Sequence, residues 1–403
     1  MISFVQGLST FALVSMLCAC GGDAASSDES AATASATLSA ITSCCAGAPI
    51  TEPVANQRTS SEPTSPTPVP APKPKPVANV ASLLLPHSLR GFNLGGSRNP
   101  PLAEQDYADL AAYGANVARI GVNAKIKADG LSFGVADAEW TYMDAVVAMG
   151  AKYGFKVIVA LQPNPWGEAE AFWESAELKE SFAQIWAAIA VRYSRNPVIV
   201  GYDLANEPVM PKDRKVPSGP PIDYWTPFAT QIIQAIRSRD PDSTIIFEPS
   251  PWGLSKGLNT LSPLPFDRIV YSFHFYDPHP LTHQGLYDYQ EVVSYPNAVT
   301  TRASLSQDME AARAFARKYA VPIYVGEFSI VRWAPADSAA RYLTDVIELI
   351  EAEGWNWSYH AFREYEGWDP EIDPSFPRYA TASRSKTATT IRLLVEKGFI
   401  RNP

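Results

Sequence analysis

Two glutamates in this sequence occupy positions where a catalytic carboxyl pair could form. Glu207 lies in Asn206-Glu207-Pro208 and Glu327 in Gly326-Glu327-Phe328, and each follows a short apolar run rich in β-branched residues. A polar pair at the end of a buried strand is costly unless its side chains have a use. Hydrolysis of a glycosidic bond needs one protonated and one ionised carboxyl group. Glu207, which follows the amide side chain of Asn206, suits the role of acid/base, and Glu327 suits the role of nucleophile.

Further polar residues are expected at the same end of other strands. Arg119, Gln162 and His274 end or lie in apolar runs, and Tyr276 follows closely. Arg119 and Tyr276 could hold Glu327 ionised by charge and hydrogen bonding, whereas Glu207 would need an environment that raises its pKa. A solvated strand end explains one glutamate alone more simply. It is a poor explanation for two glutamates accompanied by these side chains.

The elements that must position these residues alternate between strand-like and helix-like patterns. The helix-like segments cover 102–113, 138–153, 172–193, 225–239, 305–319, 336–351 and 386–397, and the fifth connection is the least helical. Short apolar strands alternating with helices favour a (β/α)₈ (TIM) barrel, whose active site lies at the carboxyl ends of the strands. The expected strands are 90–94, 116–120, 156–161, 198–204, 244–247, 269–275, 322–326 and 355–359.

These motifs together resemble family 5 of the glycoside hydrolases, in the clan with catalytic glutamates on strands four and seven. The resemblance covers essentially residues 85–400 and rests on Asn206-Glu207-Pro208, His274-x-Tyr276, Gly326-Glu327-Phe328 and Trp357. It implies retaining double displacement on β-linked glycans, without a cofactor or metal, through a covalent intermediate on Glu327.

The resemblance also implies roles for the neighbouring residues. Asn206 would contact the sugar 2-hydroxyl, and His274 and Tyr276 would line the catalytic subsite. Arg119 and Gln162 are also expected to bind the substrate. Trp357 would be the sugar-stacking platform, with Trp166 as a second candidate. Many family members have His where this chain has Gln162, which leaves the wall of that subsite open.

Several functional alternatives remain beside an endo-acting β-glucanase. A β-mannanase or an exo-β-glucosidase could use the same barrel. His274, His279 and His283 lie close enough in sequence to suggest a zinc site and a metal-dependent hydrolase. A non-catalytic glycan-binding barrel would keep the aromatic residues but would have no use for two glutamates at strand ends.

The amino-terminal region predicts export and attachment to a membrane. Residues 1–20 read as a signal peptide, and Leu17-Cys18-Ala19-Cys20 resembles a bacterial lipobox with Cys20 as the lipidated residue. Residues 21–82, rich in Ala, Ser, Thr and then Pro, predict a disordered tether before a catalytic domain at 83–403. We expect a monomer, lipid-anchored in the cell envelope, with secretion as the alternative. A net charge of -9 argues against a nucleic-acid partner.

Overall fold

The computed structural model describes residues 88–97, 101–164, 170–209, 223–335, 337–376, 378 and 383–400. The predicted signal peptide and tether lie outside the described residues, as do Cys20 and Trp166, so the expectations for them stay predictions. No described helix is long and apolar enough to cross a membrane.

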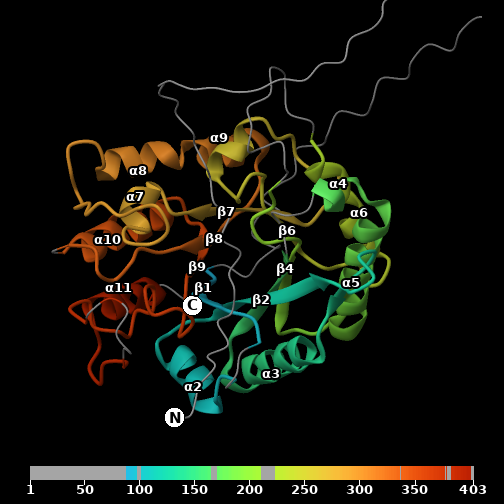
Figure 1. Ribbon diagram of the computed structural model, residues 1–403, viewed down its shortest axis with the longest axis horizontal. Coiled ribbons are helices and arrows are strands. Elements are labelled where there is room, and N and C mark those ends of the chain that lie inside the picture. Colours follow the sequence, from blue (N-terminus) through green and yellow to red (C-terminus); the bar gives the residue numbers. More distant parts are fainter. Residues whose placement is uncertain are drawn as a thin grey trace, which may run out of the picture. The chain divides into compact units, whose positions relative to one another are not determined.

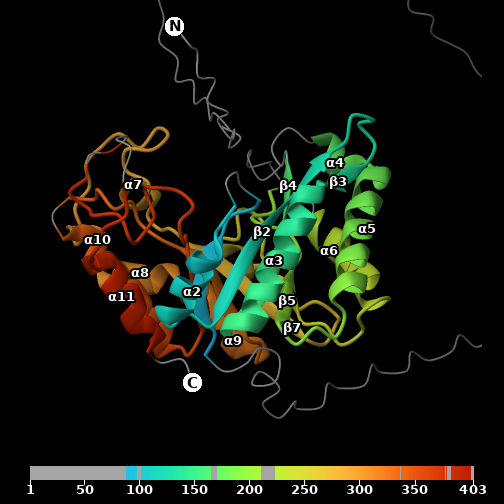
Figure 2. The ribbon, with the colours of Figure 1, turned by 90° about the horizontal axis from the view of Figure 1, so that it is seen from below.

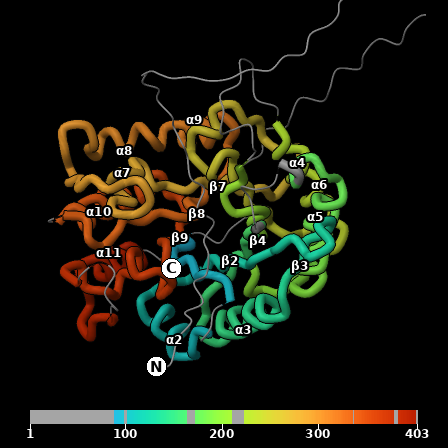
Figure 3. Tube along the Cα trace, in the orientation of Figure 1, coloured from blue at the N-terminus to red at the C-terminus, as the bar shows by residue number. Residues whose placement is uncertain are grey.

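Eight parallel strands form a closed barrel (Figure 1). The first strand pairs with the second and also with the last, so the beginning and the end of the barrel lie side by side (Figure 3). The prediction of a (β/α)₈ barrel is therefore confirmed. The strands are β1 (Arg90–Leu94), β2 (Val117–Ile126), β4 (Lys156–Asn164), β5 (Ile199–Asp203), β6 (Ile245–Phe247), β7 (Ile269–Phe275), β8 (Ile323–Phe328) and β9 (Asn356–Tyr359).

The far end of β2 is longer than expected because it forms a hairpin with β3 (Phe133–Val135), the one antiparallel pairing among the described strands. The predicted helix over 172–193 is instead two helices that meet at Ser175. The Ser175 hydroxyl accepts a hydrogen bond from the backbone N–H of Leu178 at 3.1 Å and so caps the second helix. The predicted helix over 305–319 likewise divides at Met309.

The helices surround the barrel, with α5 and α6 on one side of the strands and α10 and α11 on the other (Figure 2). The fifth connection contains the 3₁₀ helix η2 (Ser255–Asn259), in agreement with its weak helical pattern. The helices are α2 (Glu104–Ala112), α3 (Asp137–Tyr153), α4 (Glu170–Glu174), α5 (Ala176–Tyr193), α6 (Trp225–Arg237), α7 (His279–Thr282), α8 (Arg302–Asp308), α9 (Glu310–Tyr319), α10 (Ser338–Ala352) and α11 (Thr390–Phe399).

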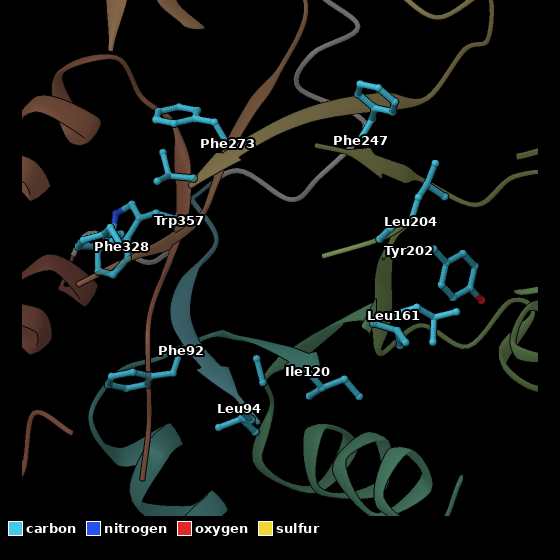
Figure 4. Close-up of a cluster of buried hydrophobic side chains, with 14 of the residues drawn as sticks. Phe92, Leu94, Ile120, Leu161, Tyr202, Leu204, Phe247, Phe273, Phe328 and Trp357 are labelled. Atoms are coloured by element: carbon cyan, nitrogen blue, oxygen red, sulfur yellow. The ribbon is translucent and has the colours of Figure 1, made fainter. Parts of the chain in front are cut away.

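Apolar side chains fill two separate regions because successive residues of a strand point to opposite faces. The larger cluster lies between the strands and the helices, where Figure 4 shows Phe92, Phe328 and Trp357. The smaller cluster contains one residue each from several strands, among them Val117 and Ile246.

Charged residues lie two positions after members of this smaller cluster, so their side chains point to the same face of the sheet. Arg119 lies two residues after Val117, and Glu248 lies two residues after Ile246. All four side chains are buried. The same alternation that packs apolar residues inside the barrel therefore sets a layer of charge above them, toward the carboxyl ends of the strands.

Candidate active site

The two predicted glutamates lie together at the carboxyl ends of β5 and β8. One carboxylate oxygen of Glu207, one of Glu327 and a ring nitrogen of His274 all lie within 4.8 Å of one another. His274 Nδ1 is 2.9 Å from Glu207 Oε1 and 3.7 Å from Glu327 Oε2. The side chain of Glu207 is 27% exposed and that of Glu327 is 10% exposed. The prediction that the fold brings these two carboxyl groups together is confirmed.

Four groups surround the carboxylate of Glu327. Arg119 donates to Oε1 at 2.8 Å, and the Tyr276 hydroxyl donates to Oε2 at 2.9 Å. Burial alone would raise the pKa of Glu327, but the charges of His274, His360 and Arg119 and the Tyr276 hydrogen bond together hold it well below its usual value. Glu327 is therefore ionised at neutral pH, which the predicted nucleophile role requires.

Glu207 is held in the opposite electrostatic state. Burial raises its pKa above the ordinary value for glutamate, and the negative charges of Glu327 and Glu248 add to this effect against the opposing influence of His274. Its backbone has φ 48°, a left-handed conformation that costs a residue other than glycine about 1–2 kcal/mol. The Glu207 N–H donates to Glu248 Oε2 at 2.9 Å, which helps to hold this conformation.

Arg119 acts on the site differently from its predicted substrate-binding role. Its five N–H groups are all used: Nε donates to Asp203, Nη1 to Asn93 and Glu327, and Nη2 to Asn206 and Glu248. None is left for a sugar hydroxyl, so that prediction is wrong. The prediction that Arg119 stabilises the ionised form of Glu327 agrees with the structure.

Glu248 and Asp203 complete the buried charge cluster, and sequence reasoning missed both. Glu248 accepts from Arg119 at 2.8 Å, and His274 Nε2 lies 3.2 Å from its carboxylate. Asp203 accepts from Arg119 Nε at 2.8 Å. Burial, opposed by Arg119, raises the pKa of Asp203 to about 8. Glu248 directly follows the predicted fifth strand, so the rule that identified Glu207 could have identified it too.

Two further residues, Asn206 and Gln162, are predicted to bind the substrate. The side-chain carbonyl of Asn206 accepts from Arg119 at 2.9 Å, which orients the amide next to Glu207. Gln162 lies on β4, half-buried, opposite Asn123 of β2. The expected contacts of both side chains with a sugar stay predictions.

Trp357 does not form the predicted stacking platform. The indole is fully buried on the helix side of β9, where it stacks on Phe399 at a centroid distance of 5.3 Å and packs against Phe328 (Figure 4). Its Nε1 donates to Glu351 of α10 at 2.7 Å. The prediction is wrong because strand alternation turns position 357 away from the barrel interior. The β9 end instead presents His360 to the carboxylate of Glu327, with Nδ1 3.4 Å from Glu327 Oε2.

The three histidines of the metal hypothesis do not converge on one point. His274 faces carboxylates with both ring nitrogens. His279 and His283 stack on each other at 5.0 Å, and burial lowers the pKa of His283 to about 3. Among the described residues, the one group of ligand-type side chains close enough to hold an ion is Glu207, His274 and Glu327, which is the carboxyl pair itself. The arrangement therefore contradicts a zinc site built from His274, His279 and His283.

Comparisons with known proteins agree with this geometry. Residues 78–365 match the family model "Cellulase (glycosyl hydrolase family 5)". Cellodextrinase A of Ruminococcus flavefaciens is 24% identical over 287 residues, which cover 66% of this chain and 83% of that protein. Endoglucanase C of Acetivibrio thermocellus is 24% identical over 278 residues, which cover 59% and 76%.

Solved structures show the same fold. Endoglucanase Cel5A from Thermotoga maritima superposes with a TM-score of 0.59 at 22% identity, over 70% of this chain and 91% of that one. A second structure of that enzyme, in complex with mannotriose, gives a TM-score of 0.61 at 21% identity, over 76% and 96%. The family match over most of the chain identifies it as a member of glycosyl hydrolase family 5, the cellulase family, and as a hydrolase of O-glycosyl bonds.

Proposed function

We propose that this protein is an endo-acting, retaining β-glucanase with Glu207 as acid/base and Glu327 as nucleophile. The observation that carries the proposal is the short distance between the two carboxyl groups, since one oxygen of each lies within 4.8 Å of the other. Retaining glycosidases hold these groups about 5–5.5 Å apart, whereas inverting enzymes need about 6.5–9.5 Å to admit a water. The opposite pKa directions of Glu207 and Glu327 support the same assignment.

The reaction follows from these protonation states in two steps. The Glu327 carboxylate attacks the anomeric carbon, the bond to the leaving oxygen breaks, and that oxygen takes the proton of Glu207. A water then attacks the same carbon and gives a proton to Glu207, while the electron pair of the breaking ester bond returns to Glu327. His274, next to both carboxylates, favours the ionised form of Glu207 after its proton has left.

An exposed aromatic ring beside Glu207 supports a glycan substrate. Of the nine tryptophans that the structure describes, only Trp252 is exposed, at 40%. The backbone N–H of Trp252 donates to the carbonyl of Pro208 at 3.1 Å, so the residue adjoins the acid/base segment. Its backbone is also left-handed, with φ 58°. A strained residue that exposes a large apolar ring next to the acid/base suits stacking on a sugar face.

The substrate is proposed from the relatives, whose names describe endoglucanases and a cellodextrinase. A mannan is the second candidate, because a related enzyme of the same fold has been solved with mannotriose. Incubation with carboxymethyl cellulose, mixed-linkage β-glucan and mannan, followed by sizing of the products, separates the candidates. Oligomers of mixed length indicate endo action, whereas a single short product from the chain ends would contradict it.

The catalytic assignment is tested with Glu327→Gln and Glu207→Gln and with aryl β-glycosides of different leaving-group acidity. We expect Glu327→Gln to abolish turnover of all of them. Glu207→Gln should lose about 10²–10⁴-fold on a poor leaving group, but much less on 2,4-dinitrophenolate, which departs without a proton. Glu353→Gln, a partly exposed acid that pairs with Arg313, is the matched control.

The pH dependence of activity tests the same assignment, because the direction of the change is predicted. Because the pKa of Glu207 is raised, wild-type activity on the poor leaving group should fall as pH rises through that pKa and the acid form is lost. The alkaline limb should vanish in Glu207→Gln. Retained turnover in Glu327→Gln, or an alkaline limb that survives in Glu207→Gln, would remove these assignments.

We further propose that the enzyme is a monomer tethered to the cell envelope by a lipid on Cys20. The support is the sequence alone: an apolar segment that ends in Leu17-Cys18-Ala19-Cys20, followed by a long stretch rich in Ala, Ser, Thr and Pro.

A further inference from the structure

A second imidazole faces the nucleophile besides His274. His360 directly follows β9, and its N–H continues the strand pairing by donating to the carbonyl of Phe328 at 3.1 Å. Its side chain is 17% exposed, and Nδ1 lies 3.4 Å from Glu327 Oε2. Since Trp357 turns outward, His360 is the residue at the end of β9 that reaches the carboxyl pair.

The ring of His360 is held by edge contacts on two sides. Trp368 lies at a centroid distance of 5.3 Å with an interplanar angle of 71°, and Tyr276 at 6.4 Å with 79°. Such packing fixes the plane of the ring and therefore the direction of Nδ1. Nδ1 is buried and has no hydrogen-bond partner among the described residues. A buried polar nitrogen without a partner requires an explanation, and the nearby Glu327 oxygen supplies one.

The other neighbours of Glu327 are uncharged, lie on its opposite oxygen or lie closer to another carboxylate. His274 Nδ1 lies closer to Glu207 than to Glu327. Arg119 holds the opposite oxygen, Oε1, and shares its charge with other carboxylates. At Oε2, the Tyr276 hydroxyl supplies a neutral hydrogen bond. His360 is thus the one imidazole near Oε2 whose close nitrogen is not engaged by another described group.

We propose that His360 is a positioning residue that acts through Glu327 and assists its departure in the second step of the reaction. This inference rests on the proposed function. When water attacks the anomeric carbon, the bond from that carbon to Glu327 breaks and its electron pair returns to the carboxylate. A hydrogen bond from Nδ1–H to Oε2 strengthens as this charge returns, and no proton is transferred. The separation of 3.4 Å needs only a small adjustment to become such a bond.

Three substitutions in the full chain separate the hydrogen bond from packing. His360→Asn places an amide N–H near the position of Nδ1, whereas His360→Phe keeps the ring contacts with Trp368 and Tyr276 but removes the donor. His279→Phe is the control, because it changes another half-buried histidine, whose ring stacks on that of His283.

The readout isolates the second step. A 2-deoxy-2-fluoro-glycosyl fluoride traps the ester on Glu327, and its hydrolysis is timed by the return of activity. We expect His360→Phe to slow reactivation by about tenfold or more, as for loss of one charge-assisted hydrogen bond, and His360→Asn to restore most of the rate. With a 2,4-dinitrophenyl glycoside, kcat of His360→Phe should fall more than kcat/KM. Equal loss in both, or no better rate in the Asn variant, would overturn the proposal.

A stability cycle tests the contact without any turnover. Melting temperatures of His360→Phe, Glu327→Gln and the double variant are measured between pH 3 and pH 8. Coupled residues give non-additive shifts. Since the charge of His360 lowers the pKa of Glu327, the stability that His360→Phe loses on acidification below the unfolded-state pKa of a glutamate should be smaller than in the wild type. Additive shifts in melting temperature and an unchanged loss of stability at acidic pH would refute the proposed role of His360. A wild-type enzyme that has no activity and forms no trapped ester would refute the proposed function instead.

Discussion

Glu248 is the buried carboxylate whose replacement most directly tests the charge cluster beneath the carboxyl pair. It is fully buried, accepts from Arg119 at 2.8 Å and from the Glu207 N–H at 2.9 Å, and lies 3.2 Å from His274 Nε2. Glu248→Gln keeps the shape of the side chain but removes its charge. The amide then offers one acceptor oxygen where two are in use, so one donor must face an NH₂ group.

The size of the effect follows from the charges that remain. Arg119 and His274 carry positive charge, Glu327 carries negative charge, and Asp203 is neutral below its pKa of about 8. Without the charge of Glu248 the buried cluster has an excess positive charge. Breaking a buried pair from one side costs about 3–5 kcal/mol. We expect the free energy of unfolding to fall by that amount, a large part of a domain's total of about 5–15 kcal/mol.

The same substitution should reduce activity. Glu248 raises the pKa of His274 and anchors the left-handed backbone of Glu207. We expect kcat/KM on an aryl glycoside to fall by roughly 10–100-fold, which corresponds to about 1.4–2.7 kcal/mol of transition-state stabilisation.

Urea unfolding and steady-state kinetics measure the two effects on the same preparation. Asp144→Asn is the control, since Asp144 pairs with Arg192 through side chains that are nearly half exposed, and such pairs contribute about 0–1 kcal/mol. If Glu248→Gln cost no more stability than this control and left kcat/KM unchanged, the account of a charge-balanced cluster beneath the site would be refuted.

Three further predictions concern Trp252, Trp357 and Cys20. Trp252→Ala should raise KM for long glucans several-fold with little change in KM for a short aryl glycoside. Trp357→Ala should instead lower the free energy of unfolding by about 3–5 kcal/mol. The reverse pattern in binding and melting assays would contradict both assignments. Cys20→Ser should abolish incorporation of labelled fatty acid and release the enzyme from the membrane fraction, and a wild-type protein without lipid by mass spectrometry would exclude the anchor.

Much of the architecture can be read from local patterns in the sequence. Each strand is an apolar segment such as that before Glu207, and each helix has its own amphipathic period, so the alternation of eight units is visible without tertiary contacts. Helix boundaries follow less directly from the pattern, because the break at Ser175 depends on one capping hydroxyl within an otherwise continuous helical pattern.

The barrel and the positions of Glu207 and Glu327 follow from local sequence patterns, because strand ends are local features and the barrel gathers them at one edge. The side chains that face the carboxyl pair at that edge depend instead on how the closed barrel packs. One step of strand alternation buries Trp357 against α10 and α11, and the residue that reaches Glu327 from the same segment is His360. The opposite protonation states of the two glutamates likewise depend on Arg119, His274 and Glu248, which meet only when distant strands close the barrel.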